Sequence, residues 1–113
     1  MTKKISKRDI KTLEEILQKE LFTDLVGETP KKLQKKIQKG KVPKLLTEKV
    51  YFIYEITEYL QGTYDHQGIR NWFDRERVEL ENNSPSQYLG FDWKPEDEYA
   101  TRVLELARFL KGK

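Results

Sequence analysis

A run of lysines is the part of this 113-residue sequence whose chemistry is easiest to state. Seven lysines fall between residues 31 and 44, and no Asp or Glu lies among them. They are Lys31, Lys32, Lys35, Lys36, Lys39, Lys41 and Lys44. Ammonium groups at this density can neutralise the phosphates of a nucleic acid backbone, so the run predicts DNA binding. The alternative is a lysine-rich helix whose charged face is simply solvated.

The segment around these lysines has the layout of a helix-turn-helix. Apolar residues at helical spacing predict a helix over 6–26, with a capping box formed by Ser6 and Asp9. Thr29-Pro30 predicts the start of a second helix, which ends at Gly40. In a helix-turn-helix the second helix enters the major groove. The predicted DNA-binding residues are therefore Lys31, Lys32, Gln34, Lys35, Gln38, Lys39 and Lys41.

These residues differ in the contacts that they can make with DNA. Lysines contact phosphates and add affinity, whereas Gln34 and Gln38 can pair with adenine edges. No arginine occurs from residue 9 to residue 69, although arginine makes the guanine contacts that most often specify a site. We therefore expect DNA binding of low sequence specificity.

Composition excludes several classes of protein. The sequence has no cysteine and a single histidine, His66, which excludes disulfides, thiolate zinc sites and a histidine-rich metal site. No nucleophile motif or glycine-rich phosphate loop occurs, so we expect no enzyme, no cofactor and no metal. No apolar run is long enough to span a membrane, and the basic N-terminus lacks the apolar stretch of a signal peptide. A cytoplasmic location is the resulting expectation.

Helical patterns continue to the end of the sequence. Thr47 is the expected N-cap of a helix that ends at Gly62, and a short helix is expected after Asp65. Ser84-Pro85 and Gln87 predict another short helix, and Pro95 predicts the start of the last one. Its expected apolar stripe is Tyr99, Val103, Leu106 and Leu110. About six short helices without a strand pair predict an all-α fold in a compact single domain.

Charge divides the chain into two halves. The formal net charge is +3, but residues 1–50 carry 14 Lys or Arg and 7 Asp or Glu, a balance of +7, and the rest carry a balance of −4. We interpret residues 1–46 as a basic helix-turn-helix-like half. Residues 47–113 form an acidic half within the same compact unit. This asymmetry indicates two different partners.

The acidic half contains six residues whose order and spacing are informative. They are Trp72, Phe73, Leu80, Ser84, Pro85 and Leu89. On these residues it resembles the toxin-binding domain of the Xre/MbcA/ParS antitoxin family. Upstream, residues 27–43 resemble the family's helix-turn-helix and residues 47–60 its long helix, so the likeness covers about residues 20–112. The sequence departs from the family at Asn82 or Asn83, which stands where a turn glycine is usual, at Ser86, and at residues 91–95.

The resemblance implies an antitoxin that sterically inhibits a cognate toxin of the RES-domain type. It also implies operator DNA as a second partner, and a homodimer. The predicted partner-binding residues are Trp93, Phe91, Glu96 and Asp97; packing of Trp93 on the last helix is the alternative for that residue. Two other functions stay open: a stand-alone DNA-binding regulator, and a bacterial or phage adaptor that binds a protein other than a toxin.

Overall fold

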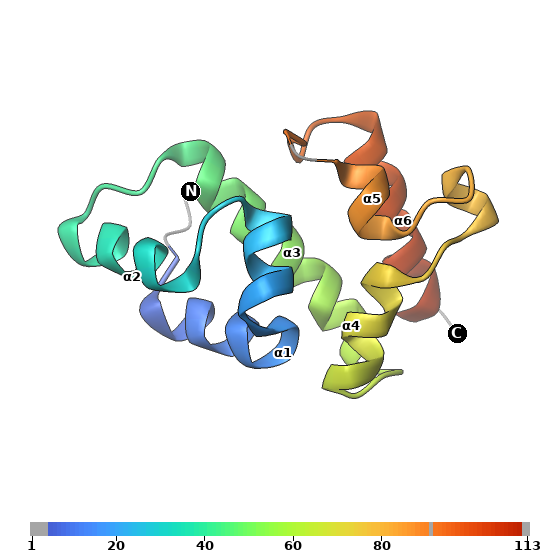
Figure 1. The fold of residues 1–113 in the computed structure, drawn as a ribbon, viewed down its shortest axis with the longest axis horizontal. Coiled ribbons are helices and arrows are strands. Elements are labelled where there is room, and N and C mark those ends of the chain that lie inside the picture. The colour runs from blue at the N-terminus through green and yellow to red at the C-terminus, as the bar shows by residue number, and fades with distance from the viewer. Residues whose placement is uncertain (1–4, 91, 112–113) are drawn as a thin grey trace.

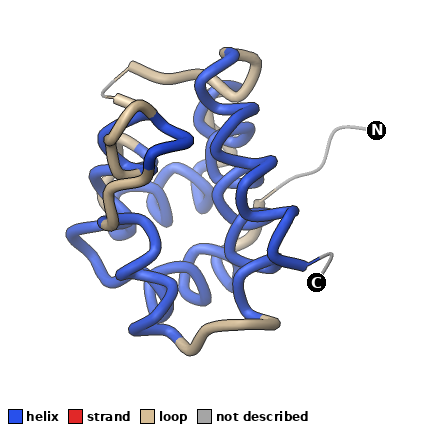
Figure 2. Tube along the Cα trace, turned by 90° about the vertical axis from the view of Figure 1, so that its right-hand side faces the viewer, coloured by secondary structure: helices blue, strands red, loops and turns tan. Residues whose placement is uncertain are grey.

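The computed structural model describes residues 5–90 and 92–111, and within them it confirms an all-α fold (Figure 1). The elements are α1 (Lys7–Val26), α2 (Pro30–Lys39), α3 (Lys44–Gln61), α4 (His66–Asp74), the 3-10 turn η1 (Val78–Leu80), α5 (Pro85–Leu89) and α6 (Glu98–Lys111). Figure 2 shows helices and loops only. An isolated backbone bridge between Arg77 and Asn83 is the sole strand-like pairing in these residues.

The helices surround one core, and α3 crosses the molecule through its middle (Figure 1). α1 packs against α2, α3 and α4, and α6 packs against α3 and α5. The molecule measures 42 × 28 × 27 Å, with α2 at one end of the long axis and η1 at the other. The lysine-bearing α2 and the turn η1 therefore lie at opposite ends of one shared core.

Helix α1 is bent at Gln18, which has φ 67° and ψ 161°. This backbone region is almost exclusive to glycine and is strained for other residues. Figure 1 shows the first part of α1 along the bottom of the molecule and the second part rising from it, with α2 lying above the first part. The bend thus creates the corner in which α2 packs.

Most of the predicted helix ends are confirmed. Ser6 and Asp9 form the capping box of α1, and Ser84 and Gln87 form that of α5. Thr29 caps α2, and Gly40 ends it with φ 69°. Asn82 has φ 66° and so replaces the turn glycine, with Glu81 also left-handed at φ 58°. These signals are local in sequence, which is why they were predictable.

Two helix starts differ from prediction. α3 begins at Lys44 after Pro43, so Thr47 is not its N-cap: the Thr47 hydroxyl lies within the first turn and donates to the Pro43 carbonyl at 3.4 Å. α6 begins at Glu98 rather than at Pro95, because residues 94–97 form a turn in which the backbone N–H of Lys94 donates to the Asp97 carboxylate at 2.9 Å.

The buried face of α6 also differs from prediction. Val103 is fully buried as predicted, but so are Ala100 and Ala107, which the prediction left out, and Tyr99 is 55% exposed. Small alanine side chains allow close approach of the helices, and α6 packs along α3. The predicted stripe consisted of larger side chains. Two of these, Leu106 and Leu110, are only partly buried.

The residues that carry the antitoxin resemblance are all buried. Trp72, Phe73, Leu80, Pro85 and Leu89 belong to the core, and Ser84 is the buried cap of α5. Ser86, one of the departures, donates its hydroxyl to the carbonyl of Phe73 at 2.9 Å and so ties α5 to the end of α4. These residues shape the acidic half from within.

We expect Gln18→Gly to stabilise the protein, because glycine adopts this backbone conformation without strain. The relief of strain outweighs the entropy that glycine adds to the unfolded chain, and the net gain is about 1 kcal/mol, or about 4 °C in Tm. Thermal unfolding followed by circular dichroism measures it. The control Lys11→Gly, at an exposed position in the regular part of α1, should lower stability by about 1 kcal/mol. A loss of stability in Gln18→Gly would contradict the strained bend.

Candidate functional site

The lysine-bearing helix α2 is attached to the core by one side only. Pro30 and Leu33 are buried, and Ile37 is partly buried. With 100° between successive residues, Lys31, Lys35, Gln38 and Lys39 fall on the side opposite Leu33, and all four are exposed. The packing of two or three apolar residues therefore leaves most of the helix surface to the lysines.

The structure divides the seven lysines into paired and unpaired groups. Lys36 donates to Glu28 at 2.8 Å, and this hydrogen bond is the main cause that lowers the pKa of Glu28. Lys44 lies 3.9 Å from Glu48. No carboxylate within the described ranges forms an ion pair with the other five, which are Lys31, Lys32, Lys35, Lys39 and Lys41. We call these five residues the lysine face.

The two glutamines differ in exposure. Gln38 is exposed on the outer side of α2, whereas Gln34 is partly buried. Of the two residues predicted to contact adenine, Gln38 is therefore better placed for a partner approaching from solvent.

Trp93 is a core residue, and the prediction that it anchors a partner on the surface is wrong. Its side chain is 2% exposed, and its indole N–H donates to the carbonyl of Leu25 at 2.7 Å. The ring lies 5.2 Å from that of Phe52 on α3. Trp93 is held by the end of α1 and by α3, and its buried N–H has a partner, as a buried indole requires.

The remaining predicted partner residues have different surroundings. Glu96 is exposed, but Asp97 accepts the backbone N–H of Lys94 and holds the turn before α6. Phe91 lies outside the described residues. Of the three predicted partner residues that the structure describes, only Glu96 is exposed to solvent.

Lys49 is a buried cation that was not predicted. Its side chain is 9% exposed, and its Nζ lies 5.3 Å from the centre of the Trp93 ring. Burial lowers the pKa of Lys49, and the charge of Asp92 opposes that change. The spacing of Lys49 with Ile53, Ile56 and Leu60, all on the buried side of α3, was the signal that could have revealed it.

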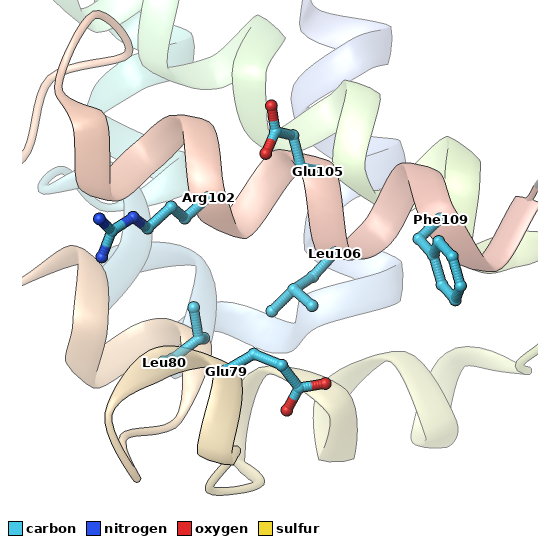
Figure 3. Close-up of a pocket in the computed structure, with 6 residues that line it drawn as sticks. All are labelled: Glu79, Leu80, Arg102, Glu105, Leu106 and Phe109. Atoms are coloured by element: carbon cyan, nitrogen blue, oxygen red, sulfur yellow. The ribbon is translucent and has the colours of Figure 1, made fainter.

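A groove lies between η1 and α6 at the acidic end of the molecule. It has a volume of about 280 Å³ and is lined by Glu79, Leu80, Arg102, Glu105, Leu106 and Phe109 (Figure 3), and we call it the α6 groove. Figure 3 shows Leu80 and Leu106 pointing into the gap between the two elements. The rim includes Phe109, which is 64% exposed, and Val78 on η1 is 82% exposed. Nothing in the sequence pattern predicted that these residues of η1 and α6 would line one groove.

Arg102 is the one cation that lines the α6 groove, and it is already engaged. Its guanidinium donates to the Tyr88 hydroxyl at 2.6 Å and to Glu98 at 2.9 Å. These two contacts raise the pKa of Arg102, with the Tyr88 hydrogen bond as the largest cause. By contrast, no ion pair to Glu79 or Glu105 is formed by any residue in the described part of the chain.

A cluster of metal-ligating side chains is absent from the described part of the chain. No group of three or more His, Cys, Asp or Glu side chains there is arranged to hold a metal ion. None of the described helices combines the length and the apolar character needed to cross a membrane. The two surfaces that stand out are therefore the lysine face and the α6 groove.

No protein-family model, curated protein or solved structure matches this chain. The resemblance to the Xre/MbcA/ParS antitoxins accordingly stays a prediction.

Lys49→Met should reveal the cost of the buried ammonium through the pH dependence of stability. Because the pKa of Lys49 is lowered by folding, the unfolded chain binds more protons between that lowered value and 10.5, and stability rises with pH in this window. Lys49→Met removes the buried charge and should be about 1 kcal/mol more stable at about pH 7. The difference should shrink towards about pH 10.

Urea unfolding at several pH values measures this difference. Lys11→Met, at an exposed position on α1, is the matched control and should show no such trend. A Lys49→Met difference that stays constant with pH would contradict the lowered pKa.

Proposed function

We propose that this chain is an antitoxin-like protein with one binding surface at each end. The lysine face binds the backbone of operator DNA, and the α4–α6 end binds and sterically blocks a cognate toxin. The observation that carries the proposal is the lysine face itself, five lysines at one end of the molecule without an ion pair among the described residues. A protein of this kind performs no chemistry and would act in the cytoplasm.

The spacing of the lysines supports contact with a linear polyanion. Lys31, Lys35 and Lys39 follow one another at intervals of four residues, which corresponds to about 6 Å of rise between neighbours on α2. Lys32 and Lys41 extend the charge on either side. Engagement of about three to five phosphates would give a slope of log K against log salt of about −3 to −4.5. Because the lysine face has no arginine, phosphate contacts would dominate over base contacts.

The acidic end supports a protein partner rather than a nucleic acid. Glu79 and Glu105 line the α6 groove there and are exposed, as are the apolar side chains of Val78 and Phe109. An apolar patch with an acidic rim suits a basic protein surface. By the antitoxin resemblance that partner is a RES-domain toxin. The six residues that carry the antitoxin resemblance are buried, so they would act by shaping the α4–α6 end.

Reversal of charge on the lysine face should abolish DNA binding. We expect Lys31→Glu/Lys35→Glu/Lys39→Glu to weaken retention of duplex DNA at low salt by at least about tenfold, because three phosphate contacts become repulsive. Gel retardation and salt titration measure the loss, and circular dichroism should stay helical. The control Lys19→Glu/Arg75→Glu/Lys94→Glu makes the same change of net charge at exposed positions outside the lysine face. Equal loss in both variants would contradict a specific role of α2.

Co-expression with the product of the neighbouring gene tests the partner. We expect the two proteins to purify as a complex and the neighbour to be harmless to cells only when this chain is present. The lysine-face variant should still form the complex, because its changes lie at the opposite end. DNA retention without a protein partner would instead favour a stand-alone regulator. A protein complex without DNA retention would favour an adaptor.

A further inference from the structure

The α6 groove has the chemistry of a socket for an apolar side chain that is flanked by cations. Leu80 and Leu106 point into it, and Glu79 and Glu105 line it without an ion pair in the described part of the chain (Figure 3). Arg102, the one basic lining residue, is held by Tyr88 and Glu98. An occupant would therefore meet the partly buried Leu106 and the exposed Phe109. Two carboxylates flank them, and these interact with Arg77 and Arg108 without forming an ion pair.

The turn between α2 and α3 has the matching chemistry. Lys41, Pro43, Lys44 and Leu45 are all exposed, with Leu45 at 40%, and we call these four residues the lysine corner. No acidic residue occurs from residue 29 to residue 47. Lys44 approaches Glu48 only at 3.9 Å, and both side chains are exposed, so this pair contributes little and is readily replaced. The lysine corner thus presents one exposed apolar side chain close in sequence to two lysines.

One chain cannot bring its own lysine corner to its own groove. The turn from α2 into α3 lies at one end of the long axis in Figure 1, whereas η1 and the end of α6 lie at the other. We propose that the lysine corner of one copy docks in the α6 groove of a second copy. Leu45 enters the groove beside Leu106 and Phe109, and Lys41 and Lys44 face Glu79 and Glu105.

This arrangement is head to tail. Each copy contributes a corner to one neighbour and a groove to another, so the contact repeats along an open series or closes into a ring. The homodimer expected from the antitoxin resemblance would stop at two copies. Because the contact is small and polar at its rim, it is weak, concentration-dependent and sensitive to salt.

The inference goes beyond the proposed function and stands apart from it. Lys41 belongs both to the lysine face and to the lysine corner, so bound DNA and a bound second copy exclude one another at this residue. Changes in the groove leave the lysine face intact, so they separate self-association from DNA binding. The two proposals can therefore fail separately.

Analytical ultracentrifugation from about 10 μM to about 1 mM tests the proposal. We expect the average mass of the wild-type protein to rise above that of a dimer at low salt and to return to that of a monomer in about 500 mM salt. The groove variant Glu79→Lys/Glu105→Lys and the corner variant Lys41→Glu/Lys44→Glu should each remain monomeric. Their equimolar mixture should associate again, because the corner of the first variant matches the groove of the second.

The control Glu15→Lys/Glu20→Lys changes the net charge as the groove variant does, at exposed positions of α1, and should associate like the wild type. The groove variant should also retain DNA as well as the wild type does. A wild-type protein that stays monomeric throughout overturns the proposal and leaves the groove for a different protein. A dimer whose mass is independent of concentration and of both variants also overturns it.

Discussion

The hydrogen bond from the Trp93 indole to the Leu25 carbonyl joins parts of the chain that are 68 residues apart. Leu25 lies in the last turn of α1, where carbonyls lack a partner within the helix, so the indole satisfies a group that burial would otherwise penalise. The same ring meets Phe52 and Lys49 on α3. This contact brings the end of α1, the middle of α3 and the turn before α6 together, and the position of α6 depends on it.

The arrangement of helices around this contact places the lysine face and the α6 groove at opposite ends of the molecule. α2 packs into the corner made by the bend at Gln18 and keeps its lysines outside the core, while α6 and η1 enclose an apolar groove with acidic lining at the far end. A protein organised in this way can hold two partners at once without competition for surface. That separation underlies the proposal of a DNA-binding end and a protein-binding end.

The fold class and most helix ends were predictable from the sequence, because caps such as Ser6, Thr29 and Ser84 act within three residues of themselves. The starts of α3 and α6 were not predictable, since Thr47 and Pro95 are plausible caps that the chain does not use. Trp93 shows the same limit for the site, because its burial depends on Leu25 and Phe52, which are distant in sequence. Lys49 could have been found from its spacing with Ile53, Ile56 and Leu60 on α3.

The sequence by itself determined an all-α chain with a dense lysine segment, a basic front and an acidic rear, because residue order and helix caps are local properties. Only the tertiary structure decided which lysines have no partner, because Lys36 finds Glu28 across a turn and Lys49 is covered by Trp93 from far along the chain. It also decided that η1 and α6 form a groove. Such contacts depend on how the helices pack against one another, which residue spacing alone does not give.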